Sequence, residues 1–289
     1  MSSSECAGSK HARFSTIAEH TVSVSNSVGL RIYSNTRPWN WKIARLQKGL
    51  IFVYKQVETI GEGAGFGVPV IACPNETYFS GSSNVYLLQE CESSIVRKEF
   101  RMDCVARNSL KNVKLENRHA RSILKRFSTL YQRYEQSRFP ILTLKNLLVR
   151  MGVKTDFVKV PSLGRAIVTY NIHRDHIVVR VDFSNLKKKS LWKIFVLNEQ
   201  GTRFFRRYCD SCGNRLVDQH VGAWDEIEAD WANITNSKGD TGFRLYKTLN
   251  SIFRVGREFQ NNCLDWIGLD YEVNSKDDFF EYTIEILGA

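Results

Sequence analysis

The chain has 289 residues, of which 43% are hydrophobic and 25% charged, the proportions of an ordinary globular protein. Its length accommodates one large β domain or two smaller ones. No window approaches the roughly 20 apolar residues of a membrane-spanning helix, and the polar first residues carry no signal-peptide pattern. The seven cysteines are odd in number and mostly isolated, which favours a reducing compartment with free thiols. We therefore expect a cytoplasmic protein without a membrane span.

The net charge of +11 is concentrated in the middle of the chain. Residues 97–159 hold 16 Lys and Arg against 5 Asp and Glu, whereas the remaining residues hold 25 of each. Such a concentration is typical of a protein with a polyanionic partner, such as nucleic acid or an acidic polysaccharide. A solvated helix face with a basic bias gives the same pattern, so composition leaves both interpretations open.

The first part of the chain is predicted to be β-structure. Residues 1–13 are polar and have no periodic pattern, which indicates a disordered N-terminus. Residues 14–107 contain short runs of β-branched and aromatic residues, such as LIFVYKQVETI at 50–60, joined by Gly, Asn and Ser clusters. This spacing favours a sandwich or barrel over βαβ units, and we assign 14–107 to a first β region.

A glycine-rich segment, GEGAGFGVPVIACPNETYFSGSS at 61–83, is the most distinctive part of this region. Glycines occupy every second position from Gly61 to Gly67, so an extended backbone would have one face without side chains. A bare face suits a flat ligand lying on a sheet, or a second sheet packed closely against it. The segment lacks the Lys-Ser/Thr of a P-loop, and the strand-like pattern after it does not fit a dinucleotide fingerprint.

The pattern changes to a helical period at 108–152, which we call the basic helical segment. Apolar residues recur at helical spacing from Ile123 to Tyr134, and a second stripe from Leu144 to Met151 follows the break at Pro140. These stripes predict a pair of amphipathic helices at 109–152. The basic residues on the opposite side of the first helix are predicted to bind a polyanion: Arg118, Arg121, Lys125 and Arg133.

Residues 153–289 are predicted to form a second β region, because runs such as RAIVTYNIH and HIVVRVDFS are rich in β-branched residues. The sequences HRD at 173–175 and NEQGT at 198–202 are hairpin signals. The predicted fold class is α+β and predominantly antiparallel β. It is a large β-sandwich, or two packed β regions, with a flanking helical pair, and the regions are compatible with a single domain.

Aromatic side chains beside carboxylates make the candidate ligand site. An indole covers the apolar face of a sugar while carboxylates accept hydrogen bonds from its hydroxyl groups. The sequence WDEIEADW at 224–231 has this combination, so Trp224, Glu226 and Glu228 are candidate ligand-binding residues. Phe66 of the glycine-rich segment is a further candidate. A core indole with a solvated acidic loop fits the same sequence.

The candidate catalytic residues are Glu62 and Tyr78 of the glycine-rich segment, and His173. His173 is two residues from Asp175, and a carboxylate neighbour suits a general base. Cys209 and Cys212 form a CxxC pair followed by glycine. A structural zinc site needs four ligands and no second CxxC or HxxxH is present, so we predict no metal and no cofactor.

Arg97 and Arg101 lie in the sequence RKEFR, which is followed at 171–173 by NIH. This order resembles the RxExR and Q-I-H motifs of jelly-roll alginate lyases. Asn171 replaces the glutamine, and FRLYK at 243–247 matches the tyrosine-bearing third motif of that family poorly. Since a guanidinium pairs bidentately with a carboxylate, the resemblance makes Arg97 and Arg101 candidates for binding a uronate sugar.

Two functions follow from these patterns. The first is a carbohydrate-binding or carbohydrate-modifying β-sandwich protein, including one that acts on an acidic sugar, because aromatic-rich sandwiches of this size resemble such proteins. Its partner would be a small or polymeric sugar. The alternative is a non-enzymatic binder of nucleic acid or another polyanion through the basic helical segment. The sequence does not decide between enzyme and binding protein, and it identifies neither substrate nor oligomeric state.

Overall fold

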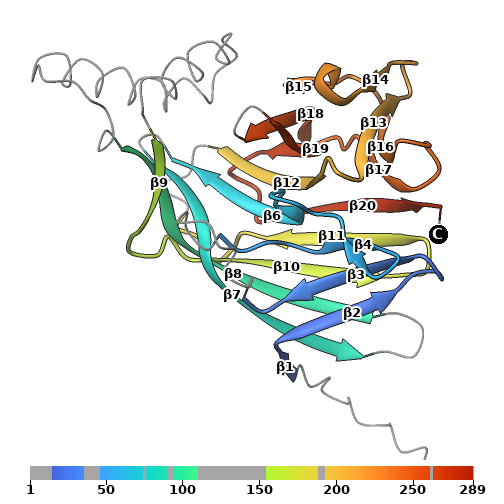
Figure 1. Cartoon of the computed structure of the whole chain (residues 1–289). Helices are drawn as coiled ribbons and strands as arrows, with labels where there is room; N and C mark the ends of the chain where they lie inside the picture. The colour runs from blue at the N-terminus through green and yellow to red at the C-terminus, as the bar shows by residue number, and fades with distance from the viewer. Residues whose placement is uncertain are drawn as a thin grey trace, which may run out of the picture.

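The computed structural model describes residues 15–35, 46–73, 76–89, 94–109, 154–187, 193–260 and 263–288, and these form two antiparallel sheets (Figure 1). The smaller sheet contains β2 (Glu19–Ser23), β3 (Val28–Tyr33), β4 (Ile51–Tyr54) and β5 (Val57–Glu58). Sixteen strands of the described residues belong to the larger sheet: β1 (Ser15–Ile17), β6 (Gly65–Ala72), β7 (Thr77–Gln89), β8 (Ser94–Ser109), β9 (Lys154–Lys159), β10 (Arg165–Ile172), β11 (His176–Asp182), β12 (Lys193–Gly201), β13 (Phe205–Asp210), β14 (Arg215–Val217), β15 (Ala223–Glu226), β16 (Trp231–Asn236), β17 (Gly242–Tyr246), β18 (Ser251–Gln260), β19 (Cys263–Val273) and β20 (Phe279–Leu287).

The larger sheet folds over itself to make a sandwich. Its main path runs β14-β13-β16-β17-β20-β11-β10-β8-β7-β6-β12-β19-β18-β15. β6 pairs with β7 only at Ile71 and Ala72, and beyond this corner it crosses the core to contact β10 and β11. We call the strands from β14 to β7 the first layer. The strands from β6 to β15, together with the small sheet, form the second layer (Figure 1).

The core lies between the two layers and is built from alternating residues of nearly every strand. Burial in β10 and β11 alternates strictly, which fits their β-branched sequences because one face of each strand meets the core and the other meets solvent. Aromatic rings join the layers: Phe66 of β6 packs edge-on against Phe243 of β17, with ring centroids 4.9 Å apart. Strands from both predicted β regions share this core, since β6 pairs with β12 and β8 with β10.

The predicted α+β class with a flanking helical pair is wrong. The described residues are almost entirely strands, and the three-residue 3-10 helix η2 (Asp218–His220) is the sole helix among them. Asn108 and Ser109, the first residues of the region assigned to helix, continue β8 and pair with β9. This long-range pairing outweighs local helix propensity, which is a weak guide without tertiary context. Residues 110–153, with the rest of the predicted pair, lie outside the described residues.

The glycine-rich segment packs inside the sandwich. Residues 61–64 make a turn, and β6 then runs through Gly65 and Gly67 with all eight residues buried. Both glycines have positive φ, at 86° and 75°, which side-chain-bearing residues rarely adopt. A Cβ on Gly67 would lie 3.0 Å from the Tyr170 hydroxyl of β10. The bare backbone therefore allows the opposite layer to pack closely against it, which is one of the two alternatives expected from the sequence.

Candidate functional site

The outward-facing residues of β12, β15, β18 and β19 form a polar surface that we call the indole face. Along β19, Ile267, Leu269 and Tyr271 point into the core and are fully buried. Side chains alternate across a strand, so the residues between them point outward. Cross-strand pairing places them in rows with outward residues of β18, namely Trp266 with Glu258, Gly268 with Gly256, Asp270 with Arg254 and Glu272 with Ile252.

Two paired glycines make the floor of this face. Gly256 and Gly268 lie opposite each other, so neither strand presents a side chain there. The Trp224 side chain from edge strand β15 fills the space over Gly256, where an added Cβ would lie 2.4 Å from its ring. A Cβ on Gly268 would lie 2.7 Å from the Asn198 carbonyl oxygen of β12 and 3.1 Å from the Glu199 side chain. Glycine at 256 therefore leaves room for the Trp224 indole, and glycine at 268 lets the backbone of β12 approach β19 closely.

Trp224 is held in an unusual backbone conformation. It has a φ of 65°, and the pairing of β15 with β18 slips by one residue at this point. For a bulky residue a positive φ is an outlier, and such strain concentrates at functional sites. Its carbonyl accepts a hydrogen bond from Arg254 Nη1 at 3.2 Å, and its indole Nε1 donates to Glu258 Oε1, also at 3.2 Å. Glu258 thus lies between two indoles, because Trp266 is its cross-strand neighbour.

Two carboxyl groups are buried beside this floor. Burial raises the pKa of Glu199 to about 7, and the negative charge of Glu258 adds to this effect. The Ala64 N–H, which donates to Glu199 Oε2 at 3.0 Å, and the Lys48 ammonium act in the opposite direction. Burial and the charge of Glu199 likewise raise the pKa of Asp270 well above its usual range. The charge of Glu199 therefore disfavours ionisation of Asp270.

The turn of the glycine-rich segment meets the indole face at a buried lysine. Lys48 Nζ donates to the Gly61 carbonyl at 2.6 Å, and burial lowers the pKa of its ammonium to about 8. Four carboxylates oppose this shift electrostatically: Glu62, Glu58, Glu199 and Asp265. The charge of Glu62 is the largest of these four opposing contributions.

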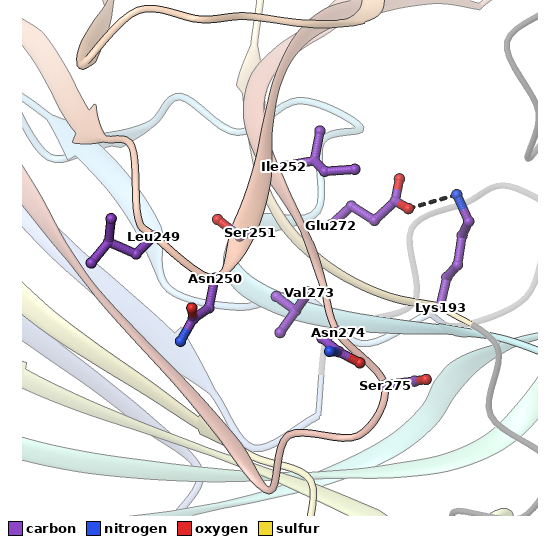
Figure 2. Close-up of a pocket in the computed structure, with 9 residues that line it drawn as sticks. All are labelled: Lys193, Leu249, Asn250, Ser251, Ile252, Glu272, Val273, Asn274 and Ser275. Atoms are coloured by element: carbon purple, nitrogen blue, oxygen red, sulfur yellow. Dashed lines mark ion pairs between the residues drawn. The ribbon is translucent and has the colours of Figure 1, made fainter.

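A pocket of about 440 Å³ opens at the other end of the face (Figure 2). Glu272 carries one side of it, with Lys193 Nζ 2.5 Å and Arg254 Nη2 2.6 Å from its carboxylate oxygens. Burial alone would raise the pKa of Glu272, but the hydrogen bonds from these two cations outweigh it and lower the pKa. The lining residues are Lys193, Leu249, Asn250, Ser251, Ile252, Glu272, Val273, Asn274 and Ser275.

The indole face places two indole rings beside carboxyl groups. Indoles offer flat apolar area with a polar edge, and the neighbouring carboxylates accept hydrogen bonds from hydroxyl groups. Burial keeps the Glu199 carboxyl protonated to a higher pH than an exposed glutamate. Clusters of perturbed titratable groups of this kind occur preferentially at functional sites.

Comparison with known proteins adds no family assignment: no family model and no curated protein matches the chain. No helix within the described ranges is long and apolar enough to cross a membrane. The described residues also contain no group of three or more His, Cys, Asp or Glu side chains that could hold a metal ion.

The structure brings some of the sequence-predicted residues together and separates others. Trp224 and Glu226 share β15, while Glu228 is an exposed residue of the following loop. Glu62 acts electrostatically on Lys48, as Glu199 does. Phe66, by contrast, is fully buried in the core.

The three candidate catalytic residues do not converge. Tyr78 pairs with Val105 near one end of β8, whereas His173 follows Ile172, which pairs with Ser94 at the other end. Eleven residues of β8 separate these points, about 36 Å at ~3.3 Å per residue. His173 lies on a hairpin, its ring stacked on His176 at 4.4 Å, and Glu62 belongs to the second layer.

Arg97 and Arg101 lie on the outward face of the first layer, away from the indole face. Cross-strand pairing puts Arg101 directly opposite Arg165. Glu99 lies between the guanidinium groups, 3.5 Å from Arg97 and 3.3 Å from Arg165. This is a network of arginines and carboxylates on an open sheet face.

Two further predictions involve the CxxC pair and the basic helical segment. Cys209 and Cys212 are free thiols, Cys209 in β13 and Cys212 in the turn that follows it. The Asp210 carboxylate organises this turn by accepting hydrogen bonds from Cys212 N and from Asn214. The four polyanion-binding candidates lie outside the described residues: Arg118, Arg121, Lys125 and Arg133.

Sequence reasoning missed Glu199, Glu258, Trp266 and Lys48. Glu199 lies inside NEQGT, which has the composition of a turn, and Glu258 and Trp266 lie in otherwise ordinary strand sequences. The available signal was the isolated glycine within each strand pattern, Gly256 and Gly268, since glycine in a strand interior marks close approach by another group.

Proposed function

We propose that the protein binds a carbohydrate on the indole face. The observation that carries this proposal is the arrangement of Trp224, Glu258 and Trp266, two indoles on either side of a carboxylate on one face of a sheet. Indole rings stack on the C–H faces of sugar rings, and the carboxylate accepts hydrogen bonds from the hydroxyl groups at their edges. The glycine floor supports this reading because it keeps the surface flat beside the rings.

Intrinsic tryptophan fluorescence tests the proposal, because Trp224 and Trp266 would both change environment when a sugar stacks on them. The protein is titrated with a panel of neutral and acidic oligosaccharides in parallel with a glycan array. Glu258→Gln keeps the shape of the side chain but weakens its acceptance of hydroxyl groups, so we expect affinity to fall about tenfold.

Glu281→Gln is the matched control, because Glu281 is a half-exposed carboxylate on the opposite layer. Its affinity should equal that of the wild type. A panel that produces no response in the wild type, or equal affinities for Glu258→Gln and wild type, would rule the proposal out. Incubation with the bound sugar and analysis of the products then separates binding alone from modification.

A further inference from the structure

The four strands of the indole face are acidic, although the chain as a whole is basic. β12, β15, β18 and β19 together contain seven Asp and Glu residues against three Lys and Arg, a formal net charge of −4, whereas the whole chain has +11. Two of the three cations, Lys193 and Arg254, form ion pairs with Glu272, which is six residues along β19 from Trp266. The third, Arg257, is opposite a core residue of β19 and therefore points to the inner side of the sheet. A surface with this excess of carboxyl groups favours a ligand of positive charge.

Three carboxyl groups gather around the indoles. Glu258 accepts a hydrogen bond from the Trp224 indole and is directly opposite Trp266, while Glu199 and Asp270 are buried beside the glycine floor. These groups are close enough to interact, because the charge of Glu258 disfavours ionisation of Glu199, and the charge of Glu199 disfavours ionisation of Asp270. A cation bound beside them offsets this mutual repulsion, which a neutral or anionic ligand cannot do.

The indole rings add a second attraction for cations. The face of an aromatic ring attracts a cation that lies within about 6 Å of the ring centre, and the effect is strongest for tryptophan. Trp224 and Trp266 are half-buried, so part of each side chain is open to a ligand. An ammonium group placed there can contact an indole face and the Glu258 carboxylate together.

The protein uses the same combination within its other layer. The Arg244 guanidinium of β17 lies over the Trp231 ring of β16, 4.5 Å from the ring centre, and its Nη1 is 3.2 Å from a carboxylate oxygen of Glu285 on β20. One cation is thus bound by an indole face and a carboxylate on three adjacent strands. The indole face offers the same two kinds of partner to the cation of a ligand.

We propose that the ligand of the indole face is a basic glycan, an oligosaccharide of amino sugars whose ammonium groups bind against Trp224, Trp266 and the Glu258 carboxylate. This inference rests on the proposed carbohydrate function and adds the substrate class, a basic rather than a neutral or acidic glycan. Hydrogen bonds between an ammonium group and a carboxylate are stronger than those from a hydroxyl group. An amino sugar should therefore bind more tightly than a neutral sugar of the same shape.

Titration calorimetry with a chitosan tetrasaccharide and a cellulose tetrasaccharide tests the inference, because these sugars differ by an ammonium group against a hydroxyl group in each ring. The titrations are made at mildly acidic pH, where the amines of the chitosan rings are protonated. We expect the wild type to bind the amino sugar about tenfold more tightly than the neutral sugar, with an affinity that falls as salt rises.

Glu258→Gln should lower the affinity for the neutral sugar about tenfold and for the amino sugar about a hundredfold, so that the preference disappears. Glu258→Lys is a second variant, which places a positive charge beside the indoles. It should bind the neutral sugar more tightly than the amino sugar, because like charges repel.

Glu281→Gln is again the matched control, since it makes the same change at a half-exposed carboxylate of the opposite layer. It should behave as wild type, and thermal unfolding checks that all variants are folded. Equal wild-type affinity for both tetrasaccharides, or tighter binding of the neutral one, would overturn the basic-glycan inference while leaving the carbohydrate function standing. Binding of neither would overturn both. A preference for the amino sugar that survives in either Glu258 variant would also refute the inference, because the ammonium groups would then bind elsewhere.

Discussion

Replacing Glu199 by glutamine should stabilise the protein in a strongly pH-dependent way. Burial raises the pKa of Glu199 from 4.5 to about 7, so the folded protein holds the proton more tightly than the unfolded chain does. The stability linked to this proton is fully present below about pH 4.5 and is lost as the pH rises through about 7. The shift corresponds to about 3 kcal/mol.

Glutamine keeps the size of the side chain, stays neutral at every pH, and can still accept the hydrogen bond from the Ala64 N–H. We therefore expect the free energy of unfolding of Glu199→Gln, relative to wild type, to rise by about 3 kcal/mol between about pH 4.5 and pH 8. Asp270 stays in place, and burial keeps its pKa raised in the variant.

Urea unfolding followed by circular dichroism, at four or five pH values across this interval, measures the difference directly. Glu281→Gln serves as the control, because its carboxylate is half-exposed and its nearest cation, Arg180, is 4.0 Å away. A stability difference that does not change with pH, or that shrinks as the pH rises, would refute the burial argument for Glu199.

Three further substitutions test other parts of the structure. Lys98 is fully buried, and burial lowers its pKa to about 7, so the stability linked to this group increases with pH. In urea unfolding, the free energy of unfolding of the wild type relative to Lys98→Met should therefore rise by about 3 kcal/mol between about pH 7 and pH 10. A difference that does not change with pH would contradict this. Asn198→Ala should lower the free energy of unfolding by about 2–4 kcal/mol in the same assay. The side-chain oxygen of Asn198 accepts hydrogen bonds from Gly67 N at 3.1 Å and from the Tyr282 hydroxyl at 2.6 Å, and the substitution removes both. A decrease of less than about 1 kcal/mol would argue against that network. Gly256→Ala should lower the melting temperature because its Cβ would lie 2.4 Å from both the ring and the backbone nitrogen of Trp224. The double variant with Trp224→Ala keeps the backbone contact but removes the ring, so it should lose less than the sum of the single changes; additive losses would show that the ring adds nothing to the clash.

Local patterns of the sequence predict the strands well where one face is buried and the other is solvated. The runs at 165–172 and 176–182 become β10 and β11, and the predicted hairpin between them is confirmed by their antiparallel pairing. The hairpin predicted at NEQGT is wrong, because β12 continues through Asn198 and Glu199 to Gly201 and pairs with β6 and β19 instead. Asn198 and Gly201 lie in a closely packed strand, and composition alone does not distinguish such a strand from a turn.

The candidate site was only partly predictable for a related reason. Trp224 and Glu62 are candidates from the sequence alone because each stands in a conspicuous local sequence. Glu199, Glu258 and Trp266 are not, because their importance arises from strands that pair only in the folded chain. Their signal is geometric, since each becomes significant through its cross-strand neighbours. A single sequence holds no record of which strands are neighbours in a sheet of this size.

The order of strands in the larger sheet has a consequence for how the protein is made. β6 is synthesised early, but its neighbour β12 leaves the ribosome only after β7 to β11. β11 in turn pairs with β20, which is synthesised near the end of the chain. At about 5–20 residues per second, several seconds pass while these strands have exposed edges. We expect nascent chains to depend on chaperones and C-terminal truncations to aggregate, because every layer of the sandwich needs the last strands to close it.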